Sequence, residues 1–137
     1  MAYLIDIKTF TDDRGSLNSI DHVLPFDIKR LYYIYNVSEN LSRGGHRHYE
    51  TLEGLICMHG SFTVLIDNGR EKTEYRLDTP AKVLLIEIGD WHVMYNLSPD
   101  AVLMGIASTN YDPKDYAYEP LKLAVHDRNE NPEILTN

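Results

Sequence analysis

The sequence predicts an all-β protein of the small sandwich or barrel type. Runs of β-branched, aromatic and aliphatic residues recur along the chain, and such runs are typical of strands. Short groups of Gly, Pro, Asn and Asp separate them, as turns require. No stretch before residue 113 keeps an apolar period of 3.6 residues, so nothing there indicates a helix. Many short, closely spaced strands in a chain of 137 residues favour a β-sandwich or a small barrel.

The apolar runs define the expected elements in order. Six strands are expected, at residues 28–37, 52–58, 61–67, 81–88, 92–97 and 101–108. A short, interrupted helix is expected at 113–127, where apolar residues return at helical spacing. The polar tail 128–137 contains a proline and is expected to be loosely ordered. The chain has the length of one domain, so we expect residues 1–137 to form a single domain with one core.

Composition and charge exclude several classes of protein. With 43% hydrophobic and 25% charged residues, the chain resembles an ordinary soluble globular protein. No apolar stretch approaches the ~20 residues that cross a bilayer, and the N-terminus lacks the features of a secretory signal. A cytoplasmic location without membrane contact is therefore expected. The net charge of -8 argues against non-specific nucleic-acid binding, which requires clustered Lys and Arg.

Three histidines stand out by their spacing. His46 and His48 are two residues apart, so on a strand both point to the same face. Four residues separate His48 from Glu53, and six residues separate Glu53 from Gly60. His92 lies between a glycine and an asparagine, at gaps of two and three residues. These spacings resemble the two signature motifs of the cupin superfamily, which lie on neighbouring strands of a jelly-roll barrel and face its interior. The resemblance implies a cupin jelly roll in which these residues share a pocket.

A closer resemblance covers about residues 8–120. The segments that carry it include FTDDRGSL (10–17), RGGHRH (43–48), CMHGSFTVLIDNG (57–69) and YDPKDY (111–116). They are similar, in the same order, to segments of the bacterial sugar 3,4-ketoisomerases, which are small cupins that act on dTDP-4-keto-6-deoxyglucose. The resemblance implies an isomerase without a cofactor that binds a dTDP-linked keto-deoxyhexose. It also implies a contribution to surface sugars, such as those of O-antigen, lipopolysaccharide or S-layer glycans.

The chemistry of this reaction fits the histidine pair. Moving a ketone from C4 to C3 requires removal of the C3 proton, an enediol, and delivery of a proton to C4. Imidazoles titrate near neutrality and suit both carbon and oxygen proton transfers. The resemblance assigns the carbon transfers to His48 and the oxygen relay to His46. The enolate charge that develops also requires donors or cations close by.

Arginines and tyrosines near the motifs complete the expected site. Alternation along the run 28–37 puts Arg30 and Tyr32 on one face and Tyr33 and Tyr35 on the other. The resemblance implies that Arg30 and Tyr32 face the pocket, which leaves packing or an interface for Tyr33 and Tyr35. One guanidinium group can bind two phosphate oxygens at once, which suits a diphosphate substrate. The expected catalytic residues are His48, His46 and Tyr32, and the expected substrate-binding residues are Arg14, Arg30, Arg43, His92 and Tyr95.

Glu53 leaves other functions open. The ketoisomerase pattern has glutamine at this position, and the ketoisomerases use no metal. With a glutamate here, a set of suitable ligands for Fe, Mn, Ni or Zn is formed by His46, His48, Glu53 and His92. A metal-dependent cupin enzyme on another small molecule is therefore the first alternative. The second is a non-catalytic cupin that binds a sugar nucleotide. We expect catalysis without metal, because a bound metal would occupy the nitrogen lone pairs that proton transfer requires.

The resemblance also implies an assembly and a product. The sheet edges of a small jelly roll need cover, and a homodimer with shared N-terminal strands provides it. Such a dimer would place the DDRGSL segment of one chain against the barrel of the other. Arg14 and His92 are similar to the residues of family members that form the galacto product. We therefore expect dTDP-3-keto-6-deoxygalactose as the product.

Overall fold

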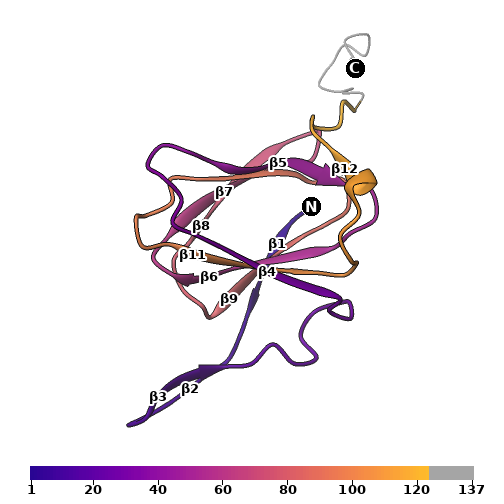
Figure 1. The fold of residues 1–137 in the computed structure, drawn as a ribbon. Helices are drawn as coiled ribbons and strands as arrows, with labels where there is room; N and C mark the ends of the chain where they lie inside the picture. The colour runs from indigo at the N-terminus through magenta and orange to yellow at the C-terminus, as the bar shows by residue number, and fades with distance from the viewer. Residues whose placement is uncertain (124–137) are drawn as a thin grey trace.

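The computed structural model describes residues 1–123, and two antiparallel sheets of five strands each face one another in it (Figure 1). The first sheet has the order β1 (Tyr3–Asp6), β9 (Lys82–Ile86), β6 (Glu53–His59), β11 (Val102–Ala107) and β4 (Arg30–Tyr35). The second sheet has the order β12 (Tyr116–Ala117), β5 (Arg43–His48), β10 (Trp91–Tyr95), β7 (Phe62–Asp67) and β8 (Lys72–Leu77). No helix among the described residues is long and apolar enough to span a membrane. The expected all-β jelly roll is confirmed.

Inward-facing residues of both sheets fill the space between them. Phe62, Val64 and Ile66 of β7 are buried, and the residues between them are half-buried. Leu55 of β6 and Leu103 of β11 belong to the same buried cluster and come from the first sheet. Side chains two apart on a strand point to one face, so the alternation of apolar residues in the sequence produces this core directly.

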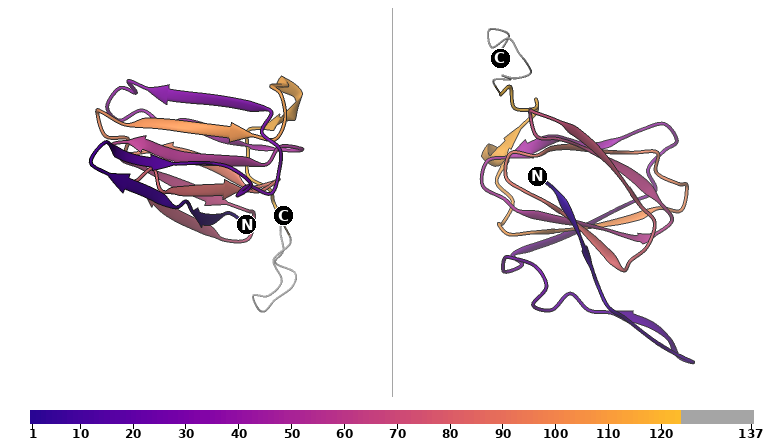
Figure 2. Two further views of the ribbon diagram at one scale, coloured as in Figure 1. Left: turned by 90° about the horizontal axis from the view of Figure 1, so that it is seen from below. Right: turned by 180° about the vertical axis from the view of Figure 1, so that it is seen from behind.

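A separate hairpin stands away from the two sheets (Figure 1, Figure 2). It consists of β2 (Thr9–Asp12) and β3 (Gly15–Asn18), which pair only with each other in the described part of the chain. Gly15 in its turn has a φ of 121°, a backbone conformation that favours glycine. Phe10 and Leu17 are 55% and 59% exposed, so the hairpin presents apolar surface to its surroundings.

The structure confirms the six strands expected from apolar runs. They correspond to β4, β6, β7, β9, β10 and β11, and their ends differ from the expected ones by no more than two residues. β5 is the strand on which the histidine motif was expected, whereas the other five strands, β1, β2, β3, β8 and β12, were not expected. β1, β2 and β3 have four residues each, and β8 alternates exposed polar residues with half-buried ones. Short or mostly polar strands carry little of the signal on which sequence patterns depend.

The expected helix at 113–127 is wrong for the part that the structure describes. Only Pro113–Asp115 is helical, as a single 3-10 turn (η1) capped by the side chain of Asp112. The next residues form β12 and pair with β5. This pairing satisfies backbone groups that a helix would satisfy internally, so a tertiary contact overrides the local preference. Residues 124–127 of the expected helix and the tail 128–137 lie outside the described residues.

Candidate active site

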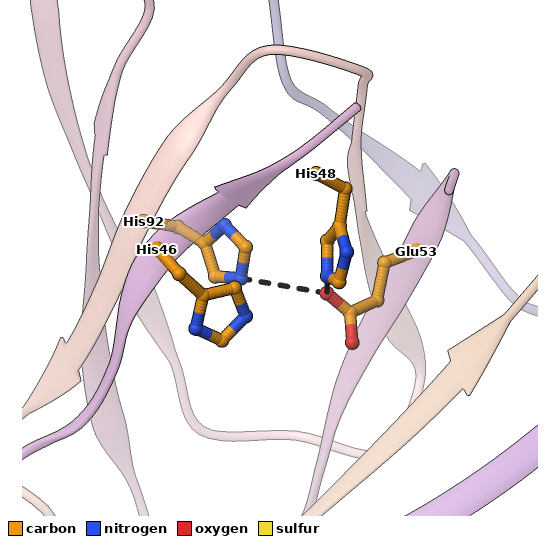
Figure 3. A group of neighbouring side chains, drawn as sticks. All are labelled: His46, His48, Glu53 and His92. Carbon is orange, nitrogen blue, oxygen red and sulfur yellow. Dashed lines mark ion pairs between the residues drawn. The ribbon is translucent and has the colours of Figure 1, made fainter. Parts of the chain in front are cut away.

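Neighbouring strands of the second sheet bring the three histidines together. β5 pairs with β10, and His46 lies opposite His92 in the ladder. The rings of His46 and His48 are 5.0 Å apart. Glu53 begins β6 on the facing sheet, and its carboxylate points at the same place (Figure 3). One ligand atom from each of the four residues lies within 4.8 Å of the others, so the motif spacing marks a single cluster.

Two glycines shape β5 beside this cluster. Gly44 and Gly45 have φ angles of 90° and 80°, and the register between β5 and β10 shifts next to His92. A bulge of this kind bends a strand and re-aims the side chains around it. A methyl group on Gly44 would lie 3.0 Å from the His92 carbonyl oxygen and 3.2 Å from the Met94 sulfur. Gly44 therefore allows the close approach of the two strands that carry His46 and His92.

Glu53 is the buried carboxylate of the cluster. Its side chain is 3% exposed, and Oε1 lies 3.5 Å from Nε2 of His48 and 3.4 Å from Nε2 of His92 (Figure 3). Oε2 accepts a hydrogen bond from the hydroxyl of Tyr32 on β4. Burial raises the pKa of a carboxyl group, but these contacts outweigh burial and lower the pKa of Glu53. Burial and the neighbouring Glu53 anion in turn raise the pKa of Tyr32 well above its ordinary value.

The two histidines of β5 differ in exposure and in charge. His46 lines a pocket, and burial together with the neighbouring His92 and His48 lowers its pKa to about 4. The side chain of His48 is 2% exposed, and its Nδ1 lies 3.0 Å from Oδ2 of Asp115. Burial lowers the pKa of His48, but contacts with Glu53 and Asp115 outweigh burial and raise it. At neutral pH, His46 is therefore neutral and faces the pocket, while His48 is held closer to its charged form behind it.

This difference argues against the expected division of roles. The expectation puts carbon proton transfer on His48 and the oxygen relay on His46. A base that removes a proton from a carbon atom must reach the substrate in its neutral form. His46 meets both conditions, whereas His48 is enclosed and hydrogen-bonded at Nδ1. The geometry favours the reverse assignment.

The pocket beside His46 has a volume of about 310 Å³. It is lined by Arg30, Tyr32, Tyr33, Ile34, Arg43, Gly44, His46, Glu53, Met94 and Tyr116. The buried Nε of Arg30 has no hydrogen-bond partner among the described residues. Two cationic side chains at one pocket, Arg30 and Arg43, suit an anionic ligand. The structure thus brings Arg30, Arg43 and Tyr32 to the place where the sequence predicts them.

Two expected site residues lie away from this pocket. Arg14 is at the turn of the β2–β3 hairpin, where its side chain is 86% exposed and pairs with Asp12. Tyr95 donates a hydrogen bond to Glu74 on β8, on the outer face of the second sheet. Residues three apart on a strand face opposite sides, so Tyr95 points outward because His92 points inward. Contrary to expectation, Tyr95 lines a separate groove of about 840 Å³, which is larger but contains none of the clustered histidines.

Sequence reasoning missed two residues at the cluster. Asp115 holds His48, as described above, and the ring of Tyr116 is 4.7 Å from the rings of both His46 and His48. Nη1 of Arg30 lies 3.5 Å from the hydroxyl of Tyr116. Both missed residues belong to the segment YDPKDY, which carries the resemblance but gave no role to either of them. Their contacts depend on η1 and β12, which the sequence pattern did not predict.

The four clustered side chains also offer a set of donor atoms that could hold a metal ion. A tetrahedral ion bound at about 2.1 Å holds its ligand atoms about 3.4 Å apart. The distances from Oε1 of Glu53 to the two histidines, 3.4 and 3.5 Å, match that spacing. Nε2 of His48 and Oε1 of Glu53 are buried and lack hydrogen-bond partners among the described residues. The types of donor and these two distances therefore fit a divalent ion.

The fold and the site together define a class of protein. An antiparallel jelly roll in which histidines of two neighbouring strands cluster between its sheets, one of them beside a pocket, is a cupin-type protein with a titratable interior site. Residues 2–126 match the family model described as "FdtA: WxcM-like, C-terminal", and the chain belongs to this family.

Three relatives show what the chain is similar to. The TDP-4-oxo-6-deoxy-alpha-D-glucose-3,4-oxoisomerase of Aneurinibacillus thermoaerophilus is 40% identical over 115 residues, which cover 82% of this chain and 83% of the relative. A mutant of the 3,4-ketoisomerase QdtA from Thermoanaerobacterium thermosaccharolyticum, in complex with TDP-4-keto-6-deoxyglucose, has a TM-score of 0.84 and 33% identity over 86% of this chain and 87% of that chain. WlaRA, a TDP-fucose-3,4-ketoisomerase from Campylobacter jejuni, has a TM-score of 0.81 and 33% identity over 86% of this chain and 89% of that chain.

Proposed function

We propose that this protein is a sugar-nucleotide 3,4-ketoisomerase that converts TDP-4-keto-6-deoxyglucose to the 3-keto-6-deoxyhexose. The observation that carries the proposal is a neutral His46 at a pocket with two arginines, Arg30 and Arg43. A neutral imidazole suits the carbon proton transfers, and guanidinium groups bind the diphosphate and stabilise enolate charge. The three relatives are named as 3,4-oxo- or ketoisomerases, and one of them holds this sugar nucleotide. We also propose a cytoplasmic location and a contribution to surface glycans such as O-antigen, lipopolysaccharide or S-layer glycans.

His46 moves the proton between the two carbon atoms in this proposal. Its unprotonated ring nitrogen takes the proton from C3, the C3–C4 bond gains double-bond character, and the carbonyl electrons move to O4. The protonated His46 then returns the proton to C4, and O3 becomes the carbonyl oxygen. The Glu53 anion beside it stabilises the imidazolium formed on the way, since its charge raises the pKa of His46 against the effect of burial.

The proton that moves between the two substrate oxygens is transferred by Tyr32, Glu53 and His48. The reaction balances only if O3 loses a proton and O4 gains one. Tyr32 lines the pocket and donates to Glu53, whose other oxygen lies 3.5 Å from His48. Tyr32 is the group that contacts the substrate oxygens. His48, on the other side of Glu53, holds the proton between its removal from O3 and its delivery to O4.

A turnover assay separates this enzyme from a non-catalytic cupin that binds the same compound. The purified protein should convert TDP-4-keto-6-deoxyglucose to the 3-keto isomer, which NMR distinguishes by the carbon that carries the ketone. Calorimetric binding of the sugar nucleotide without any isomer would favour the binding protein.

We expect the protein to work without metal. Elemental analysis of the purified protein should find well under one metal ion per chain, and a chelator should leave the isomerase rate unchanged. The reason is that a bound metal would occupy the lone pair of His46 that takes the C3 proton. Stoichiometric metal together with chelator-sensitive turnover would favour the metal-dependent alternative.

We further propose a homodimer in which the β2–β3 hairpin of one chain lies against the barrel of the other. The hairpin exposes Phe10 and Leu17, and the edge strand β4 exposes Leu31, Tyr33 and Tyr35. Edge strands and apolar surface of this kind favour association with a second copy. Exchange of the hairpin would also explain why Arg14 lies far from the pocket of its own chain.

Sedimentation at micromolar concentration should give about twice the chain mass of 15.8 kDa. Replacing Phe10 and Leu17 together with aspartate should shift the protein toward the mass of one chain, because charge on the hairpin opposes burial. Leu41→Asp is the matched control, since Leu41 is 59% exposed on the connection between β4 and β5. A single-chain mass for the unaltered protein would contradict the homodimer.

We expect the galacto product, TDP-3-keto-6-deoxygalactose. The face on which C4 receives its proton sets the configuration there, and the resemblance links Arg14 and His92 to the galacto outcome. The ring of His92 is 4.8 Å from that of His46, so it is close enough to influence how the intermediate sits. Reduction of the fresh product and comparison with fucose and quinovose standards reports the configuration at C4. A quinovose-type C4 would contradict this expectation without affecting the ketoisomerase assignment.

A further inference from the structure

Asp115 uses its two carboxylate oxygens for two different tasks. Oδ1 accepts hydrogen bonds from the backbone amides of Tyr49 and Glu50, at 3.0 and 2.7 Å. Oδ2 accepts from the hydroxyl of Thr51 and lies 3.0 Å from Nδ1 of His48. The first oxygen therefore fixes the carboxylate to the chain between β5 and β6, and the second faces the buried imidazole.

The contact at Oδ2 decides which nitrogen of His48 faces the cluster. A carboxylate accepts hydrogen bonds and donates none, so Nδ1 of His48 carries a proton. Nε2 is then left to face Oε1 of Glu53 at 3.5 Å. A hydrogen bond at one imidazole nitrogen sets both the protonation of the other and the orientation of the ring.

We propose that Asp115 is a positioning residue that keeps Nδ1 of His48 protonated and directs Nε2 toward Glu53. The inference rests on the proposed function, because His48 and Glu53 serve the oxygen proton there. Asp115 itself does not line the pocket beside His46, so it acts through His48. The contact joins residues 67 apart in the sequence, and η1 presents the carboxylate by turning the chain at Pro113.

Asp115→Asn separates the two tasks. The backbone amides require an acceptor, so the amide oxygen should stay with Tyr49 and Glu50, and the NH₂ group should take the place of Oδ2. The hydroxyl of Thr51 can adapt by rotating, because Thr109 lies 2.7 Å away as another partner. Nδ1 of His48 then meets a donor, and the tautomer with the proton on Nε2 is favoured. The anchoring of the turn is kept, while the orienting contact is reversed.

Two measurements report the effect. The ¹⁵N shifts of the His48 ring should change from a protonated to an unprotonated Nδ1. The kcat for isomerisation should fall about 10- to 100-fold, as is typical when an orienting partner is lost. KM should change little, and exchange of the C3 proton with deuterated water should continue, because His46 is untouched.

Asp112→Ala is the control for a purely structural role. The side chain of Asp112 caps the same turn by accepting from the amide of Lys114 at 2.9 Å, and it has no hydrogen bond with His48. This variant should be less stable than the unaltered protein. The ¹⁵N shifts of its His48 ring should be unchanged, and so should the ratio of the rate of C3 proton exchange to the rate of isomerisation. If Asp115→Asn behaves in the same way as Asp112→Ala, the positioning role is overturned.

The unaltered protein gives a test that needs no variant. Its ¹⁵N spectrum should show a protonated Nδ1 on His48, and an unprotonated Nδ1 would overturn the inference even if Asp115→Asn fails to fold. The spectrum is independent of turnover, so failure of the ketoisomerase assay would reject the proposed function without deciding the contact between Asp115 and His48.

Discussion

His46→Asn should lower turnover about 10²- to 10⁴-fold, the typical cost of losing a general acid–base group. Asparagine keeps a polar side chain of similar size but cannot take the C3 proton. Binding of the nucleotide should be nearly unchanged, since the two arginines at the pocket remain. Exchange of the C3 proton with deuterated water should be lost together with turnover, and both are measured in one NMR experiment.

His48→Asn is the informative comparison. If His48 serves the oxygen proton, this variant should turn over slowly while C3 exchange continues. Both residues lie on the same face of β5, and they differ in that His46 lines the pocket and His48 is 2% exposed. Loss of C3 exchange in His48→Asn and its survival in His46→Asn would restore the division of roles expected from the resemblance.

Gly105→Ala should lower both stability and turnover, because this glycine makes room for Tyr32. The two residues lie opposite each other in the pairing of β11 with β4, and a methyl group built on Gly105 overlaps the Tyr32 ring. The ring must move, and its hydroxyl then leaves Glu53. Overpacking typically costs about 1–3 kcal/mol, and loss of a preorganised donor costs about 10²- to 10³-fold in kcat. Denaturant unfolding and the isomerase assay measure the two effects.

A double-mutant cycle identifies the clash. In a Tyr32→Val background the methyl group has room, so Gly105→Ala should cost little further stability. An equal loss of stability in both backgrounds would show that the backbone of β11, and not the ring of Tyr32, resists the substitution.

Much of the fold and the cluster could be predicted because they depend on local spacing. The two-residue period of a strand places His46 with His48 and Arg30 with Tyr32, and the structure puts these side chains where the period requires. The same rule applied to β10 separates Tyr95 from His92. Tyr95 was expected to bind the substrate, and the two-residue period of this strand argues against that role.

The rest depends on contacts between distant parts of the chain. Asp115 reaches His48 only because β12 pairs with β5, and this pairing also replaces the expected helix. The different environments of His46 and His48 are set by burial and by Glu53 and Asp115 together, which spacing along one strand does not report. The placement of Arg14 on a projecting hairpin likewise follows from tertiary structure.

Incubation of the protein with TDP-4-keto-6-deoxyglucose in deuterated water, followed by NMR, is the most direct test of 3,4-ketoisomerase activity with proton transfer by His46. We expect a 3-keto product that carries deuterium at C4, because the proton held by His46 during the enediolate stage exchanges with solvent. Recovered substrate should carry deuterium at C3 for the same reason. A sugar nucleotide that stays unchanged, with the ketone at C4 and no deuterium at C3, would contradict the assignment of the protein as a 3,4-ketoisomerase.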